Sequence, residues 1–96
     1  MKSKNLERLQ KQLAEFAIVR DWDKFHSPKK LAMALSSEAG ELTEIFQWLT
    51  EKESRILTSK QQSQAEEEIA DVFLYLLRLS DKLNIDVLQA AKKVRK

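Results

Sequence analysis

The scarcity of turn-forming residues is the feature of this sequence that most limits its fold. Glycine and proline occur once each in 96 residues, whereas the helix-favouring residues Leu, Ala, Glu, Lys and Gln are plentiful. A sheet of several strands needs turns that this composition does not supply. We therefore predict an all-α fold, as a single domain over residues 1–96, that is small enough for a partner chain to add usefully to its buried core.

The spacing of apolar residues predicts four helices, two of them long. Leucines three and four residues apart mark amphipathic helices with one buried stripe. The pair Ser27-Pro28 marks the start of the second helix, because Ser caps a helix and Pro is tolerated in its first turn. The expected helices cover about 5–20, 28–49 and 59–83, with a short last helix capped by Asp86 and a polar connection at 50–55.

Two pairs of carboxylates interrupt the apolar pattern of the long helices. Glu38 and Glu41 lie three residues apart, as do Glu68 and Asp71, so the members of each pair point in a similar direction. Apolar residues follow four positions later, which places the pairs at the border of the core. Crowded carboxylates there persist through partners, protonation or a cation. We predict Mg²⁺, with Mn²⁺ as a substitute, bound together with substrate phosphates.

Composition and charge exclude several other classes of protein. The chain has no cysteine, so disulfides, thiolate metal sites and Cys nucleophiles are excluded. Its single histidine, His26, lies outside both acidic pairs, which disfavours a di-iron bundle. Residues 38–71 hold nine acidic and three basic side chains within a net charge of +2, which argues against binding a nucleic-acid polymer. With no membrane-length apolar run and no apolar signal-peptide core, we expect a soluble cytoplasmic protein.

An aromatic residue accompanies each acidic pair. Trp48 follows Glu41 by seven residues and Tyr75 follows Glu68 by seven, which places both on the carboxylate-bearing helix faces. A flat ring there can stack on a nucleobase while the carboxylates hold a metal and its phosphates. The alternative is that both rings fill the core, the commoner fate of an aromatic at helical spacing.

The quoted motifs together resemble a known family. RDWDKFHSPKKLAMALSSEAGELTEIFQW followed by EEIADVFLYLLRL closely resembles the MazG-like all-α nucleoside triphosphate pyrophosphohydrolases, especially the branch that includes the dCTP pyrophosphatases. The resemblance covers about residues 16–93. It implies a four-helix-bundle-like fold assembled as a dimer or tetramer, and Mg²⁺-dependent hydrolysis of (deoxy)nucleoside triphosphates to monophosphate and pyrophosphate, which clears surplus or non-standard nucleotides from the pool.

The resemblance also implies roles for individual residues. Glu38, Glu41, Glu68 and Asp71 would be the catalytic metal ligands, and the substrate-binding residues would be Trp22, His26, Lys30, Trp48, Tyr75 and Lys93. Relatives commonly carry Asn where Lys30 stands. The chain also stops one residue before an Asn that follows the position of Lys93 in relatives, so we expect the C-terminal end of the domain to be incomplete.

Two alternative functions compete with the hypothesis of a nucleoside triphosphate pyrophosphohydrolase. A phosphoribosyl-ATP pyrophosphohydrolase-like enzyme shares the fold, although the RDW and FQW aromatics favour a base-stacking pocket. A non-catalytic helical oligomeric interaction module would keep the fold without the chemistry. Loss of a motif carboxylate would have favoured that module, and all four are present.

Overall fold

The computed structural model describes residues 4–94, and within that range the chain forms helices and connections with no strand. The predicted all-α fold is confirmed. Residues 1–3 and 95–96 lie outside the description, as does the predicted incomplete end of the domain. None of the described helices is long and apolar enough to span a bilayer. The helices are α1 (Lys4–Val19), η1 (Asp23–Phe25, a 3₁₀ turn), α2 (Pro28–Phe46), α3 (Glu51–Arg55), α4 (Ser59–Lys82) and α5 (Val87–Val94).

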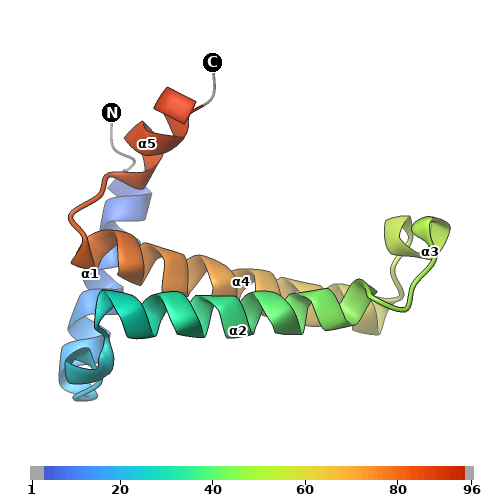
Figure 1. Cartoon of the computed structure of the whole chain (residues 1–96), viewed down its shortest axis with the longest axis horizontal. Coiled ribbons are helices and arrows are strands. Elements are labelled where there is room, and N and C mark those ends of the chain that lie inside the picture. The colour runs from blue at the N-terminus through green and yellow to red at the C-terminus, as the bar shows by residue number, and fades with distance from the viewer. Residues whose placement is uncertain (1–3, 95–96) are drawn as a thin grey trace.

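The long helices α2 and α4 lie side by side in opposite directions and form the most extensive contact between elements (Figure 1). Helix α1 packs against α4 near one end of this pair, and α3 lies at the other end, where the chain turns back. Helix α5 continues outward on the α1 side. The buried apolar side chains of residues 4–94 are Ala17 on α1, Leu31 on α2, and Ala65 and Leu77 on α4. The core therefore lies along the α2–α4 seam and under α1.

The predicted helix starts are confirmed by their caps. The Ser27 hydroxyl accepts a hydrogen bond from the Lys30 backbone N–H at 3.2 Å, and Pro28 is the first residue of α2. The Asp86 carboxylate accepts one from the Gln89 backbone N–H at 3.2 Å, at the start of α5. Each cap satisfies a backbone donor that the first helical turn leaves without a partner.

The connection predicted at residues 50–55 is wrong, because that stretch contains α3. The Thr50 hydroxyl accepts from the Glu53 N–H at 3.1 Å, and the Glu53 carboxylate accepts from the Thr50 N–H at 2.9 Å. This capping box starts a helical turn without an apolar stripe. Helix α2 also ends at Phe46, short of the predicted Leu49. The part of the chain that the structure describes thus has five α-helices in place of the predicted four.

The end of α1 fixes the loop that carries Trp22. The Trp22 N–H donates to the Ala17 carbonyl at 2.8 Å, and the Asp21 N–H donates to the Ile18 carbonyl at 3.0 Å. Asp21 adopts φ 58°, so the helix ends in a Schellman motif with a left-handed residue. The Trp22 ring then meets Phe16 edge-on, with ring centroids 5.4 Å apart.

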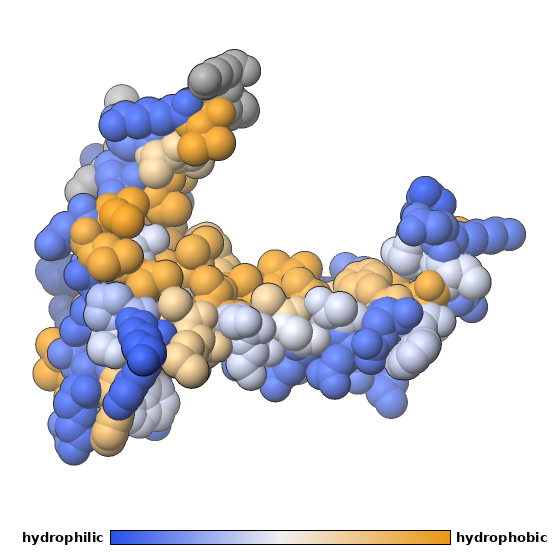
Figure 2. Space-filling view, viewed as in Figure 1, coloured by the Kyte–Doolittle hydropathy of each residue, from blue (hydrophilic) through white to orange (hydrophobic). Residues whose placement is uncertain are grey.

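One copy of the chain is unusually open. Its Cα radius of gyration is 15.5 Å, against about 13 Å for a compact chain of about 100 residues. Its accessible surface is 7632 Å², about 1,900 Å² more than a folded monomer of its mass exposes. Apolar surface gathers along the concave edge between α5 and α3 (Figure 2). A single copy therefore pairs α2 with α4 without closing a four-helix bundle.

Leu77→Ala is expected to lower the free energy of unfolding by about 2–5 kcal/mol. Leu77 is 1% exposed in a small core, so truncation leaves a cavity that few neighbours can fill. Ile56→Ala is the matched control, because Ile56 is 74% exposed and should change stability by about 0.5 kcal/mol or less. Urea unfolding followed by circular dichroism measures both. Equal stability of the two variants would contradict the assignment of the core.

Candidate active site

Three carboxylates from the two long helices converge at the middle of their seam. One oxygen from each of Glu38, Glu41 and Glu68 lies within 4.8 Å of the others. Glu38 and Glu68 are half-buried and Glu41 is exposed. The Oε2 atoms of Glu38 and Glu68 are shielded from solvent and receive no hydrogen bond. An oxygen-only set with unsatisfied buried acceptors fits a hard divalent cation such as Mg²⁺.

The crowding shifts the acidity of the cluster. Burial, followed by the neighbouring carboxyl groups of Glu41, Glu38 and Asp71, raises the pKa of Glu68 to about 7. The adjacent Glu41 carboxyl group, followed by burial, raises the pKa of Glu38. Each carboxyl disfavours the charge of the next. Without a cation the cluster therefore retains a proton close to neutral pH.

The metal-free protein is expected to lose stability as the pH rises from about 5 to about 8. The folded state holds the Glu68 proton up to a pKa of about 7, whereas the ordinary value for a glutamate is 4.5, so over this window the folded state binds more protons than the unfolded chain. Melting temperatures in EDTA measure the effect. Glu68→Gln should reduce the fall in melting temperature with pH, and saturating Mg²⁺ should raise the melting temperature near pH 8. A melting temperature that rises with pH equally in both proteins would contradict the shift.

Asp71 connects the acidic cluster to a second feature, an apolar cavity. Its charge acts on both Glu38 and Glu68, yet it lines a separate hollow of about 240 Å³ between α1, the η1 loop and α4. The lining residues are Leu13, Phe16, Ala17, Trp22, His26, Asp71, Leu74, Tyr75 and Arg78. The structure therefore brings together three of the predicted substrate-binding residues beside a predicted metal ligand.

The carboxylates also border a more open acidic hollow on their other side. This hollow has a volume of about 530 Å³ and is lined by Glu41, Glu44, Ile45, Gln64, Glu67 and Glu68. Glu41 and Glu68 thus face it while Asp71 faces the aromatic cavity. The arrangement offers an apolar end and an acidic end to one ligand.

The other predicted substrate-binding residues lie elsewhere in a single copy. Trp48 follows the end of α2 and is 86% exposed. Trp48 and Tyr75 each follow a carboxylate by seven residues, which is about 10 Å along a helix. Because α2 and α4 are antiparallel, the two rings lie in opposite directions from the carboxylates. Trp48 and Tyr75 therefore do not share one pocket within one chain. Lys30 is exposed in the first turn of α2, with its Nζ 5.6 Å from the centre of the Phe25 ring, and Lys93 is exposed in the last turn of α5.

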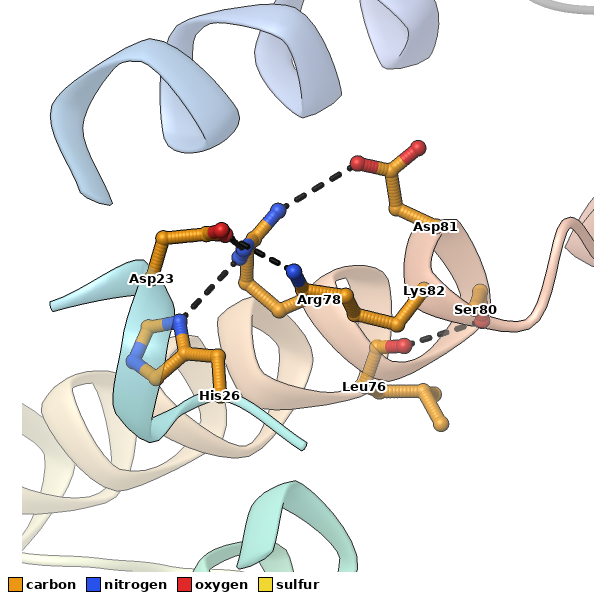
Figure 3. A network of polar contacts seen from close by, with 7 residues as sticks. All are labelled: Asp23, His26, Leu76, Arg78, Ser80, Asp81 and Lys82. Carbon is orange, nitrogen blue, oxygen red and sulfur yellow. Dashed lines mark hydrogen bonds and ion pairs between the residues drawn. The ribbon is translucent and has the colours of Figure 1, made fainter. Parts of the chain in front are cut away.

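A polar network around Arg78 was not predicted from the sequence. Arg78 Nη2 donates to Asp23 Oδ1 at 2.7 Å, Nη1 to Asp81 Oδ2 at 3.3 Å, and Nε to His26 Nδ1 at 3.4 Å (Figure 3). Lys82 Nζ lies 2.8 Å from the same Asp23 oxygen, and its hydrogen bond is the main reason that the pKa of Asp23 is lowered. The available signal was the spacing of Arg78, three residues after Tyr75 and three before Asp81, which places the three on one helix face.

Comparison with known proteins identifies the family. Residues 33–96 match the model of the MazG-like family, and the chain belongs to that family. It is 40% identical over 87 residues to dCTP pyrophosphatase 1 of Mus musculus, covering 88% of this chain and 51% of that protein. It is 39% identical over 84 residues to dCTP pyrophosphatase 1 of Homo sapiens, covering 85% and 49%. The chain thus spans about half the length of these curated relatives.

A solved structure shows the same fold. The crystal structure of a pyrophosphatase from Archaeoglobus fulgidus superposes with a TM-score of 0.88 at 40% sequence identity. The match covers 97% of this chain and 87% of the archaeal chain. The resemblance inferred from the acidic and aromatic motifs is confirmed at the level of family and fold.

Proposed function

We propose that this protein is a Mg²⁺-dependent pyrophosphohydrolase that cleaves (deoxy)nucleoside triphosphates to monophosphate and pyrophosphate. The observation that carries the proposal is the cluster of three converging carboxylates, with two buried oxygens lacking donors, directly beside a cavity lined by Trp22 and Tyr75. The names of the dCTP pyrophosphatase relatives and of the archaeal pyrophosphatase support the same reaction.

Glu38, Glu41 and Glu68 would hold the metal, with Asp71 completing the ligand set at the edge of the aromatic cavity. When bound, the metal supplies polarisation of the phosphoryl oxygens and offsets charge on the leaving pyrophosphate. The carboxylates come from two facing helices, so the α2–α4 seam fixes their spacing before a substrate arrives. A carboxylate of this set would also orient the water that attacks the α-phosphorus.

The aromatic cavity would hold the base. Trp22 and Tyr75 offer rings for stacking, and His26 adds a polar group among apolar walls. dCTP, the nucleotide in the names of the curated relatives, has a single-ring base. We propose dCTP or a non-standard pyrimidine deoxynucleotide as substrate, and removal of surplus nucleotides in the cytoplasm as the task.

A second copy of the chain would complete the site. Ile69, Phe73 and Leu76 are 56%, 43% and 36% exposed and form one apolar stripe on α4, because they lie four and three residues apart. The surface excess of about 1,900 Å² is more than the roughly 800 Å² per partner of a standard interface. We propose a homodimer in which two α2–α4 pairs make a four-helix bundle, with tetramers formed from such dimers. Trp48 of a second copy would then be available to the base.

The substrate class is tested by measuring pyrophosphate release from a panel of canonical and modified NTPs and dNTPs, with phosphoribosyl-ATP included. The expected result is release from pyrimidine deoxynucleotides in Mg²⁺ and none in EDTA. Preference for phosphoribosyl-ATP would assign the protein to the alternative enzyme. No release from any compound would favour the non-catalytic helical module.

Trp22→Ala is expected to raise KM for the preferred nucleotide by about 10- to 100-fold, because stacking of one base is worth about 1–3 kcal/mol. The kcat should change less, since the carboxylates stay in place. Phe25→Ala is the matched control, because Phe25 is in the same loop, 54% exposed, and does not line the cavity. Steady-state kinetics with a melting curve for each variant measures this. An unchanged KM in Trp22→Ala would contradict the placement of the base.

A further inference from the structure

The proposed reaction leaves one buried charged residue without a role. Arg78 is 6% exposed and lines the aromatic cavity. A guanidinium stays protonated at any physiological pH and has donors but no acceptor. Burying it is costly unless charges and hydrogen bonds compensate. Asp23 and Asp81 supply that compensation, each through one terminal nitrogen of Arg78.

The Nε–H group of Arg78 sets the protonation state of His26. Arg78 Nε lies 3.4 Å from His26 Nδ1, and because Nε–H is always a donor, Nδ1 must be the unprotonated acceptor. A proton on Nδ1 would set two donors against each other. Burial, followed by the charge of Arg78, lowers the pKa of His26, and the charge of Asp23 only partly opposes this. The imidazole is therefore neutral, with its proton on Nε2.

The far nitrogen of the ring points away from Arg78. Figure 3 shows Nε2 on the side of the imidazole opposite the contact with Nδ1. His26 lines the same cavity as Trp22 and Tyr75, so a base stacked there would meet the imidazole edge. Asp23 anchors the η1 loop, which precedes His26, to Arg78 on α4 across 55 residues of sequence. The network thus fixes both the position of the ring and its proton.

We propose that Arg78 is a positioning residue that holds His26 in the neutral Nε2–H form, so that the cavity presents one fixed hydrogen-bond donor to an acceptor atom on the edge of the base. The ligand named here rests on the proposed function, whereas the state of His26 does not. The Nε2–H group of His26 would select against a base that has only a hydrogen-bond donor at that edge. Two donors that face each other leave both N–H groups without an acceptor.

The state of His26 is measured directly by long-range ¹H–¹⁵N NMR of the ¹⁵N-labelled protein at pH 7. His26 is the single histidine of the chain, so its ring signals need no assignment by mutation. The expected result is an unprotonated Nδ1 and a protonated Nε2. A protonated Nδ1, or a doubly protonated ring, would overturn the proposal. Because no nucleotide is present, this outcome is independent of whether the protein hydrolyses one.

The role of Arg78 is tested by Arg78→Met, which keeps an unbranched side chain without donors. The expected result is a mixture of the two tautomers and a KM raised about threefold to tenfold at nearly unchanged kcat. Asp81→Asn is the matched control, because it alters another partner of Arg78 and leaves the Nε contact in place; its ring signals should match wild type. Wild-type ring signals in Arg78→Met would overturn the role of Arg78.

A second pair of variants keeps the proposal testable if Arg78→Met does not fold. The amide of Gln at position 26 can place its NH₂ group near the position of Nε2, whereas the shorter amide of Asn reaches the position of Nδ1. His26→Gln should therefore keep a lower KM than His26→Asn. Equal KM values for the two variants would overturn the claim that Nε2 is the donor to the base.

Discussion

Glu41→Gln is expected to lower Mg²⁺-dependent pyrophosphate release by about 10²–10³-fold, because the cation that would offset the charge on the leaving pyrophosphate loses a ligand. Glu41 bridges the two helices of the cluster, because its carboxylate oxygen lies within 4.8 Å of those of Glu38 and Glu68. An amide keeps the size of the side chain and removes the charge that a cation needs. The measurement is initial rate against Mg²⁺ concentration.

The matched control for Glu41→Gln is Glu66→Gln. Glu66 is an exposed glutamate of α4 that lines neither hollow next to the cluster, so its activity should stay close to that of wild type. Glu41→Gln should also fold at least as well as wild type in EDTA, because it removes a carboxyl group that raises the pKa of both Glu38 and Glu68. Full activity in Glu41→Gln would contradict a catalytic role for the carboxylate cluster.

Phe73→Glu is expected to convert the proposed homodimer to a monomer and to lower the melting temperature. Phe73 is the middle residue of the exposed stripe on α4, at 43% exposure. A charge buried at an apolar interface without a partner should weaken association by about 30-fold or more, since loss of a central contact costs about 2 kcal/mol or more. Sedimentation velocity over a range of protein concentrations measures the change.

Ile18→Glu is the control for Phe73→Glu, because Ile18 is 66% exposed but lies on α1, outside the stripe. It should remain dimeric. If Trp48 of a second copy serves the base, Phe73→Glu should also lose activity at protein concentrations where it is monomeric. A wild-type protein that sediments as a monomer at micromolar concentration would contradict the proposed dimer.

The helices could be predicted from the sequence wherever a cap or an apolar stripe marked them. Ser27 and Asp86 marked the starts of α2 and α5 through single side-chain bonds. Helix α3 was missed because it has no buried face and forms through the reciprocal bonds of Thr50 and Glu53. The Thr-x-x-Glu pattern could have predicted the start of α3. For one short helix such a capping box is a stronger indication than apolar periodicity.

Helical spacing predicted that Glu38 and Glu41 share one face of their helix at the border of the core. Their convergence with Glu68 also depends on the packing of α2 against α4. The position of Trp48 could not be predicted, since spacing gives the face of a helix but not the direction of its neighbour. Helices α2 and α4 run antiparallel (Figure 1), so Trp48, just beyond the end of α2, and Tyr75, in the second half of α4, lie in opposite directions from the carboxylates. The role of Arg78 depends on its contacts with η1, residues distant in sequence that periodicity along one helix does not reveal.

The central claim is that the acidic cluster supports metal-dependent cleavage between the α- and β-phosphates of a nucleotide. The most direct test is ³¹P NMR of dCTP incubated with the protein, once with Mg²⁺ and once with EDTA. We predict equal amounts of dCMP and pyrophosphate with Mg²⁺ and intact dCTP with EDTA. Formation of dCDP and phosphate, or hydrolysis that proceeds equally in EDTA, would contradict the proposed role of the cluster.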